Sequence, residues 1–230
     1  KDVFQEADIT GAVESFVKYS YIVKNVEDIP RVFKEAFYIA NTGRRGPVLI
    51  DVPIDVQNAK FDFSYPESFS LRTYKPTVKG HIIQIKKVIA ELSKAKMPLI
   101  CVGGGTILGN GEQVVREFAN KFHIPVVSTM MGIGVMPNDD DLYMGMLGTN
   151  GKPHANYAVH ECDVLVLVGA RVADRAVVKP YKLERRNTTI VHIDVDPAEI
   201  GKNLGTTVPL VGDVHVIFEN LLQYGIPGDY

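Results

Sequence analysis

Short apolar runs alternate with longer amphipathic stretches along the last two thirds of the chain. The run at residues 99–102 (LICV) is apolar throughout, as in a strand that is buried on both faces of a sheet. Further runs of both kinds predict strands at residues 125–128, 164–168, 189–194 and 208–211, and helices at residues 82–92, 111–122, 156–160 and 214–222. Strands that alternate with helices are typical of an α/β fold, in which helices cover both faces of a parallel sheet.

The first third of the chain carries a weaker pattern. Residues 4–23 mix polar with aromatic and β-branched side chains and predict an irregular extended segment. A helix is predicted over residues 27–43, because a proline suits its first turn and a glycine suits its end. Its buried face is expected to consist of Ile29, Val32, Phe33, Ala36, Phe37 and Ala40. Residues 47–53 then predict a strand, so this region should be the closing half of an α/β unit whose opening half is missing.

The hydrophobic pattern is lost over residues 54–77, where prolines, serines and scattered aromatic residues occur together. Such a composition predicts a linker that runs over the surface, with its aromatic side chains holding it to its neighbours. The predicted organisation is therefore a partial α/β domain at residues 1–57, a linker at residues 58–77, and a complete nucleotide-binding-like domain at residues 78–230.

Three consecutive glycines, at residues 103–105, follow the first strand of the second domain. Glycine allows φ > 0 and, having no Cβ, lets a phosphate approach the backbone N–H groups at a helix start. The pattern indicates a Rossmann-like nucleotide-binding unit, although a purely structural turn fits it equally well. The carboxyl ends of parallel strands meet at one edge of a sheet. We therefore expect residues 103–105, 128–131, 169–171, 194–196 and 212–213 to converge there.

Charged residues at this predicted edge are candidate ligand contacts. Arg171 and Arg175 could reach a pyrophosphate through bidentate hydrogen bonds. The alternative is that one of them pairs with Asp174 or Asp194 and only holds the loop. Asp194 and Asp213 could accept hydrogen bonds from ribose hydroxyls or an adenine amino group, and Asp213 equally suits the N-cap of the helix that follows it.

Composition and charge exclude several classes of protein. A hydrophobic share of 46% with 23% charged residues is that of a soluble globular protein, and no apolar stretch reaches the roughly 20 residues of a membrane span. The net charge of -2, without a basic run, argues against nucleic-acid binding. Cys101 and Cys162 lie in apolar segments and are interpreted as buried core residues of a reducing compartment. The histidines lack metal-ligand spacing and no nucleophile motif occurs, so we expect a cofactor-holding chain without reactive groups of its own.

Several longer segments together resemble one enzyme family. In chain order they are FQEADITG, EDIPRVFKEAF, GRRGPVLIDVP, VGGGT, YMGMLGTNGKPHANYAV, DVLVLVGARVADR and VHIDVDPAEIGKN. They resemble the catalytic large subunit of acetolactate synthase (acetohydroxyacid synthase), a thiamine diphosphate-dependent enzyme, from about Phe4 to the C-terminus. The resemblance implies that this chain is the end of the pyrimidine-binding domain followed by the whole central domain.

The resemblance also implies an activity and cofactors. In this family, thiamine diphosphate and Mg²⁺ support the decarboxylation of pyruvate and its condensation with a second 2-keto acid, a step of branched-chain amino acid biosynthesis. The activating glutamate and the metal-binding motif of the family would lie outside this chain, so the isolated chain is expected to be inactive. The resemblance further implies a cytoplasmic enzyme that forms a homodimer or homotetramer, with a possible regulatory subunit.

In this family the central domain binds FAD, which takes no redox part in the main reaction. By the resemblance, the flavin contacts fall on Arg44, Gly103, Gly104, Gly105, Thr129, Met130, Leu147, Gly148, Gly169, Ala170, Arg171, Arg175, Asp194, Val195, Asp213 and Val214. Phe4, Gln5 and Lys18 would lie near the edge of the active site in the family. The alternative for these three is that they are polar surface groups of the first domain.

The chain departs from the family pattern at four positions. Ile54 replaces a lysine near the substrate channel, Ala173 replaces an aspartate, and Thr149 and Asn150 replace a Met-His pair. These changes leave two alternatives open. One is a sister thiamine diphosphate enzyme such as glyoxylate carboligase or sulfoacetaldehyde acetyltransferase. The other is a non-catalytic module of the same fold that binds NAD or another nucleotide.

Overall fold

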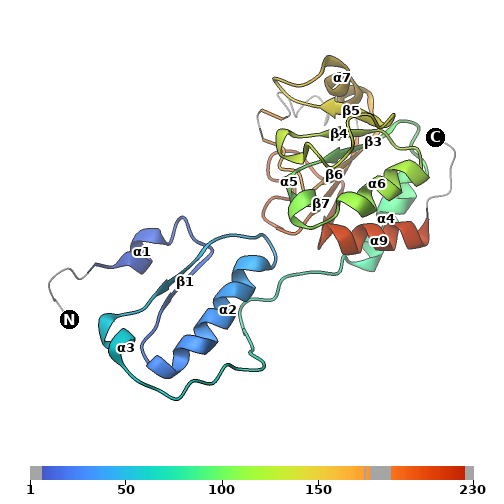
Figure 1. Ribbon diagram of the computed structural model, residues 1–230. Coiled ribbons are helices and arrows are strands. Elements are labelled where there is room, and N and C mark those ends of the chain that lie inside the picture. The colour runs from blue at the N-terminus through green and yellow to red at the C-terminus, as the bar shows by residue number, and fades with distance from the viewer. Residues whose placement is uncertain (1–6, 174, 177–187, 226–230) are drawn as a thin grey trace. The chain divides into compact units, whose positions relative to one another are not determined.

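The computed structural model describes residues 7–173, 175–176 and 188–225 of the chain. The chain divides into two compact units, Lys1–Pro76 and Thr77–Tyr230, each described here by itself (Figure 1). The boundary falls at the end of the segment that was predicted to be a linker, so residues 58–76 belong to the first unit. Within the described residues, no helix is both long enough and apolar enough to cross a membrane.

The first unit is built on a β-α-β arrangement. Its elements are α1 (Ile9–Val13), β1 (Tyr19–Ile22), η1 (Val26–Asp28), α2 (Ile29–Asn41), β2 (Val48–Asp51) and α3 (Ile54–Asn58). β1 and β2 pair in parallel, with Tyr19 opposite Val48. The prediction that the opening part of this β-α-β arrangement is missing was wrong, because β1 precedes α2 and pairs with β2. The irregular segment predicted before α2 was also partly wrong, since Asp8 accepts a hydrogen bond from the Gly11 backbone N–H and caps the short helix α1.

Helix α2 buries only part of the predicted face. Val32, Ala36 and Ile39 are buried, whereas Phe33 and Phe37 are 40% and 67% exposed. Val32 packs in the small core that also contains Val23 and Val56. The helical spacing of apolar residues is compatible with two neighbouring apolar faces on this helix. The face that packs on the sheet is the one with the smaller side chains.

Residues 61–76, here called the strap, have no helix or strand and pack on α2. The Lys34 ammonium donates to the backbone oxygens of Pro66 and Glu67, at 2.5 and 2.8 Å. The ring of Tyr38 contacts the ring of Phe69, with centroids 5.1 Å apart. The prediction that aromatic side chains hold this segment to its neighbours is therefore confirmed.

The second unit is a six-stranded parallel sheet covered by helices, which confirms the predicted fold class. Its elements are α4 (Ile82–Leu92), β3 (Pro98–Val102), α5 (Gly104–Leu108), α6 (Glu112–Lys121), β4 (Val126–Ser128), η2 (Met130–Gly132), β5 (Tyr143–Met146), α7 (Pro153–Glu161), β6 (Val164–Val168), β7 (Thr189–Asp194), β8 (Val208–Val211) and α9 (Val214–Tyr224). The strand order is β5-β4-β3-β6-β7-β8. The first strand of the unit is therefore central, and the chain builds one side of the sheet and then the other.

Strand β5, helix α5 and the short η2 of the second unit were not predicted. Strand β5 was missed because its sequence, YMGM, is only partly buried and contains Gly145 at φ +89°, and its pairing with β4 has an irregular register. Helix α5 was missed because glycine disfavours helices, yet Gly104 and Gly105 form its first turn. The glycine turn therefore leads into α5 and not directly into α6.

The two faces of the sheet carry separate apolar cores. Ile100 and Val102 of β3 face a core with α4, α6 and α9, which lie beside one another in Figure 1, whereas Leu99 faces a core with α7. This alternation is what a strand buried on both faces requires. Cys101 and Cys162 are buried in the second core, as predicted, and form no disulfide, and burial raises the pKa of Cys101 to about 12.

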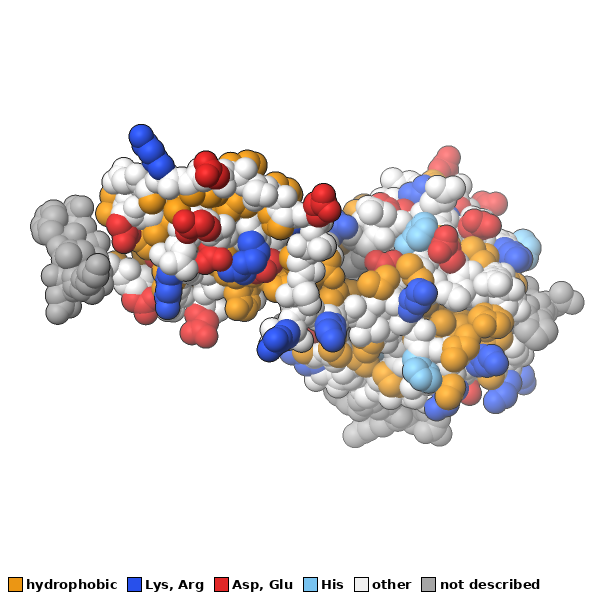
Figure 2. Space-filling model, turned by 90° about the horizontal axis from the view of Figure 1, so that it is seen from below, with side chains coloured by type: hydrophobic (Ala, Val, Ile, Leu, Met, Phe, Trp, Pro, Cys, Tyr) orange, Lys and Arg blue, Asp and Glu red, His pale blue; other side chains and the backbone are white. Residues whose placement is uncertain are grey.

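The surface is mixed in character. On the face shown in Figure 2, lysine and arginine side chains are interspersed with acidic and apolar ones and form no single basic patch. Among the described residues, no group of three or more histidine, cysteine, aspartate or glutamate side chains is arranged to hold a metal ion.

Candidate functional site

The candidate site lies at the carboxyl edge of the six-stranded sheet. β3 and β6 are neighbours, but the chain leaves β3 toward β4 and leaves β6 toward β7. Ligands of open parallel sheets bind where the connections diverge in this way. Because all strands are parallel, the predicted residues 103–105, 128–131, 169–171, 194–196 and 212–213 lie at or directly after strand ends at this one edge, together with residues 147–148 after β5. The predicted convergence is confirmed.

Backbone contacts hold the ends of β3 and β6 close together. The N–H groups of Gly103 and Gly105 donate to the backbone oxygens of Val168 and Gly169, both at 2.9 Å. A Cβ on Gly103 would lie 2.3 Å from the Gly169 backbone oxygen. A Cβ on Gly105 would lie 2.7 Å from the Gly169 Cα. These two glycines therefore serve the structural turn that was the alternative interpretation. Of the three, only Gly104 makes no backbone hydrogen bond within the described residues through its N–H.

The neighbouring strand ends are joined in the same way. The Thr129 N–H donates to the Val102 oxygen at 2.9 Å, and the Leu147 N–H donates to the Ser128 oxygen at 2.9 Å. On the other side, the N–H of Gly169, at φ +52°, donates to the Ile193 oxygen at 2.9 Å. Backbone hydrogen bonds thus join each strand end at this edge to the next one. The glycines among these residues add no side chains to the edge.

The two arginines of the edge differ in their surroundings. Arg171 is exposed and makes no ion pair or hydrogen bond with any described residue through its guanidinium. The interpretation in which it pairs with Asp194 has no support, and Asp174 lies outside the described residues. The Arg175 backbone oxygen accepts a hydrogen bond from the Thr149 N–H at 3.1 Å, so its loop lies against the loop after β5.

The two aspartates each support a local turn. Asp194 is buried, and its Oδ1 accepts a hydrogen bond from the Asp196 N–H at 2.9 Å. Asp213 is the N-cap of α9, and its Oδ1 accepts from the Val216 N–H at 3.2 Å, as the alternative interpretation proposed. A carboxylate can accept several hydrogen bonds, so a cap does not exclude a ligand contact.

Other predicted contacts are limited by burial. The side chains of Leu147, Ala170 and Val214 are at most 4% exposed, so only their backbones could touch a ligand. Val195 is half-buried, whereas Met130 is 67% exposed beside the glycine turn.

Four predicted positions belong to the first unit. Phe4 and Gln5 lie outside the described residues, and Arg44 lies in the turn between α2 and β2. The Lys18 ammonium donates to the backbone oxygens of Ile39 and Thr42, each at 2.5 Å, and to the Tyr74 hydroxyl at 2.7 Å. An ammonium has three donors, so Lys18 is fully committed to structural contacts.

Several residues that shape the edge were not predicted from the sequence. The Asn156 side chain accepts from the Gly148 N–H at 2.8 Å and donates to the Gly148 oxygen at 2.9 Å. It thereby holds Gly148 at φ +107°. The buried Thr106 hydroxyl donates to the Val168 oxygen at 2.9 Å. Only the position of Thr106 directly after the glycines could have indicated its role, whereas the role of Asn156 depends on where α7 packs.

A buried histidine lies on β7 below the edge. His192 is 2% exposed, and its Nε2 has no hydrogen-bond partner within the described residues. Burial lowers the pKa of His192, against the opposing influence of a backbone hydrogen bond with Ala170 and of the Glu199 charge. The imidazole is therefore neutral at pH 7, and its link to Ala170 connects β7 with the loop that carries Arg171.

A known protein family and several known proteins match this chain. Residues 85–221 match the family described as thiamine pyrophosphate enzyme, central domain. The acetolactate synthase large subunit of Haemophilus influenzae is 44% identical over 225 residues, which cover 96% of this chain and 39% of that protein. The acetolactate synthase isozyme 3 large subunit of Escherichia coli (strain K12) is 41% identical over 224 residues, with the same two coverages.

A third relative gives the same result. The probable acetolactate synthase large subunit of Methanocaldococcus jannaschii is 42% identical over 224 residues, which cover 96% of this chain and 38% of that protein. The chain therefore spans less than half the length of the curated relatives it matches. Its parallel sheet, its glycine-rich edge and the match over residues 85–221 agree, and the chain belongs to the thiamine pyrophosphate enzyme family, whose central domain it contains.

Proposed function

We propose that this chain is part of the catalytic large subunit of an acetolactate synthase. Such an enzyme decarboxylates pyruvate and joins the remaining two-carbon unit to a second 2-keto acid. The observation that carries the proposal is the 44% identity to an acetolactate synthase large subunit, which extends over 96% of this chain. None of the relatives described above favours the alternatives, which were a glyoxylate carboligase, a sulfoacetaldehyde acetyltransferase and an NAD-binding module.

Thiamine diphosphate, held through Mg²⁺, would supply the electron sink for this reaction when bound to the whole enzyme. In this proposal its binding groups lie in parts of the protein beyond the present chain. Ile54, which is 69% exposed at the start of α3, would border the substrate channel without a positive charge. The whole enzyme would be a cytoplasmic homodimer or homotetramer, and the name "large subunit" of the relatives supports a smaller regulatory partner.

We further propose that the sheet edge of the second unit holds FAD as a structural group. The residues present fit an elongated dinucleotide, because the strand ends of the parallel sheet meet at this edge and the Gly104 N–H at the start of α5 has no backbone acceptor among the described residues. Arg171, with no partner in the described residues, would hold the pyrophosphate. The carboxylates of Asp194 and Asp213 would accept hydrogen bonds from the ribose or adenine.

The remaining contacts in this proposal are assigned by resemblance. They are Arg44, Gly103, Gly104, Gly105, Thr129, Met130, Leu147, Gly148, Gly169, Ala170, Arg175, Val195 and Val214. The Gly104 N–H is the backbone donor of the glycine turn that is available to a ligand. Ala173, Thr149 and Asn150, which depart from the family pattern, all lie near this edge and are expected to tune flavin affinity rather than to abolish it.

The proposed activity is tested by assaying acetolactate formation from pyruvate with added thiamine diphosphate, Mg²⁺ and FAD. The chain extended to the length of its relatives should form acetolactate, and the present 230-residue chain should not. Turnover by the present chain alone would show that the catalytic groups have been misplaced. An extended protein that binds its cofactors but accepts only glyoxylate or sulfoacetaldehyde would replace the proposed reaction with that of a sister enzyme.

A further inference from the structure

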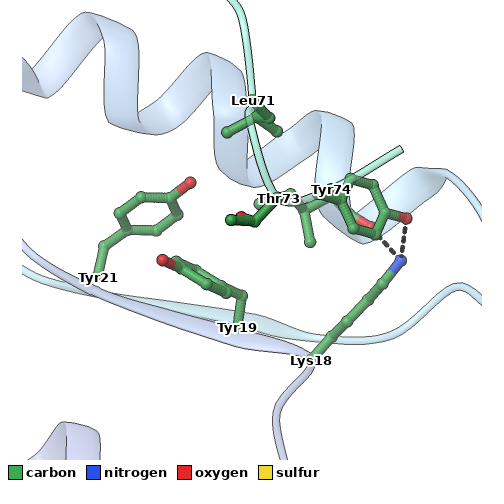
Figure 3. A pocket seen from close by; sticks show the side chains of 7 residues that line it. Lys18, Tyr19, Tyr21, Leu71, Thr73 and Tyr74 are labelled. Atoms are coloured by element: carbon green, nitrogen blue, oxygen red, sulfur yellow. Dashed lines mark hydrogen bonds between the residues drawn. The ribbon is translucent and has the colours of Figure 1, made fainter. Parts of the chain in front are cut away.

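A cavity of about 200 Å³ lies within the first unit, between β1 and the strap. The rings of Tyr19 and Tyr21 form one side, and Leu71 and Thr73 of the strap face them across the cavity (Figure 3). The two rings lie together, with centroids 4.8 Å apart. No part of this cavity belongs to the sheet edge of the second unit, and nothing in the proposed reaction uses it.

The cavity carries a positive charge at one end. The Lys18 ammonium is bonded to two backbone oxygens and the Tyr74 hydroxyl, all neutral groups, and pairs with no carboxylate among the described residues. The acidic residue Glu35 lies next to Tyr21. Its carboxylate accepts a hydrogen bond from the Tyr21 hydroxyl at 3.1 Å and forms an ion pair with Arg31 at 3.0 Å. Its charge is thus balanced by Arg31, and the lysine charge stays unbalanced.

Two hydroxyls of the cavity are available to a ligand. Neither the Tyr19 nor the Thr73 hydroxyl makes a hydrogen bond with a described residue. The Tyr21 hydroxyl is committed to Glu35, and burial together with that carboxylate raises the pKa of Tyr21, so its ring stays neutral. The cavity therefore offers aromatic walls, free hydroxyl donors and a net positive field.

The size of the cavity limits the ligand. A dry cavity of about 150 Å³ accommodates benzene, whereas sites for drug-sized ligands and cofactors begin at about 300 Å³. We propose that the cavity binds a small aromatic carboxylate. The ring lies between the tyrosine rings and Leu71, and the carboxylate faces the Lys18 charge and accepts a hydrogen bond from the Thr73 hydroxyl.

The test is a titration of the full 230-residue chain with benzoate at pH 7, by calorimetry and by saturation-transfer NMR. One site with a Kd of about 1 mM is expected, and benzamide, which has the same shape and no charge, should bind at least fivefold more weakly. Thr73→Val should weaken benzoate binding about fivefold by removing one hydroxyl. The matched control is Thr77→Val, at another exposed threonine, which should leave the affinity unchanged.

A second variant tests the place of binding. Leu71→Trp fills the cavity and should abolish benzoate binding while circular dichroism stays unchanged. Benzoate binding that persists in a folded Leu71→Trp variant would overturn the proposal, and so would equal binding of benzoate and benzamide. Absence of saturable binding to the unsubstituted chain would overturn it as well. None of these results depends on flavin or thiamine binding, so failure here leaves the proposed function intact.

Discussion

Arg171 is the residue on which flavin binding should depend most strongly. Its guanidinium is exposed, follows the end of β6, and has no partner in the described part of the chain. Side chains that are already paired must lose a contact before they bind a ligand, and Arg171 has none to lose. Its position was predicted from the sequence because glycine and polar residues follow a continuous apolar strand.

Replacement of Arg171 by alanine should weaken FAD binding by about 1–3 kcal/mol, the usual cost of losing a charge-assisted hydrogen bond. Flavin fluorescence quenching measures the affinity. The matched control is Lys87→Ala, which removes an exposed positive charge from α4. An unchanged affinity in the arginine variant, or an equal loss in the lysine variant, would remove Arg171 from the site.

His192 should make the stability of the second unit depend on pH. Its pKa in the folded state is lowered by burial, so the unfolded state binds more protons as the pH falls through about 6.5. The stabilisation is therefore present above pH 6.5 and is lost at lower pH, by at most about 1.4 kcal/mol for each pH unit.

The variant that tests this dependence is His192→Gln, which keeps a hydrogen-bond donor but does not titrate. Between pH 7 and pH 5, the free energy of unfolding should fall more steeply for the unsubstituted chain than for this variant. Urea unfolding at several pH values measures the difference. His154→Gln, at an exposed histidine of α7, should leave the slope as it is in the unsubstituted chain. Parallel slopes for all three proteins would show that His192 titrates normally.

At the scale of elements, the conformation of the turn between β3 and α5 depends on its close approach to the backbone of the loop after β6. The glycines of this turn suggest phosphate binding when read from the sequence, yet Gly103 and Gly105 use their N–H groups to join β3 to the loop after β6. The pattern could not separate the two roles, because both require a residue without a Cβ.

Gly103→Ala should lower the free energy of unfolding of the second unit by about 2–3 kcal/mol, since the new Cβ would lie 2.3 Å from the Gly169 backbone oxygen. The matched control is Gly104→Ala in the same turn, where the nearest atom is the Cβ of Met131 at 3.0 Å. A contact of 3.0 Å requires only a small shift of η2, which carries Met131, whereas a contact of 2.3 Å requires two backbone segments to separate, so this change should cost at least about 1 kcal/mol less. Equal losses in urea unfolding would contradict the assigned role of Gly103.

Some elements could be predicted from the sequence and others could not, for physical reasons. β3 and β6 are apolar throughout because both faces of each strand are buried, and such runs are conspicuous. β5 lies at the end of the sheet, is only partly buried and contains a glycine, so its sequence carries no such signal. For α2 the existence of the helix was predictable, but its buried stripe depended on the partner sheet.

At the scale of the whole molecule, topology explains why the predicted strand ends converge on one edge. Residues from five different loops come to one edge only because every strand of the sheet runs in the same direction. That direction follows from the alternation of strands and helices, which the sequence displays. The side-chain contacts that shape the edge, such as that of Asn156 with Gly148, depend on tertiary packing and leave no local trace.

The first unit has a much smaller sheet than the second. It contains two paired strands among its described residues, with aromatic side chains such as Phe37 exposed on α2. Two-stranded sheets are marginally stable by themselves, so further protein is expected to complete this unit. This agrees with the chain spanning 39% of its Haemophilus influenzae relative.

The central claim, that the sheet edge of the second unit holds FAD, is tested most directly by titrating the purified 230-residue chain with FAD and, separately, with NAD. Flavin absorbance retained after gel filtration measures the bound FAD, and competition measures the NAD. The account predicts one FAD per chain and at least tenfold weaker binding of NAD. Absence of saturable FAD binding, or a preference for NAD, would contradict it.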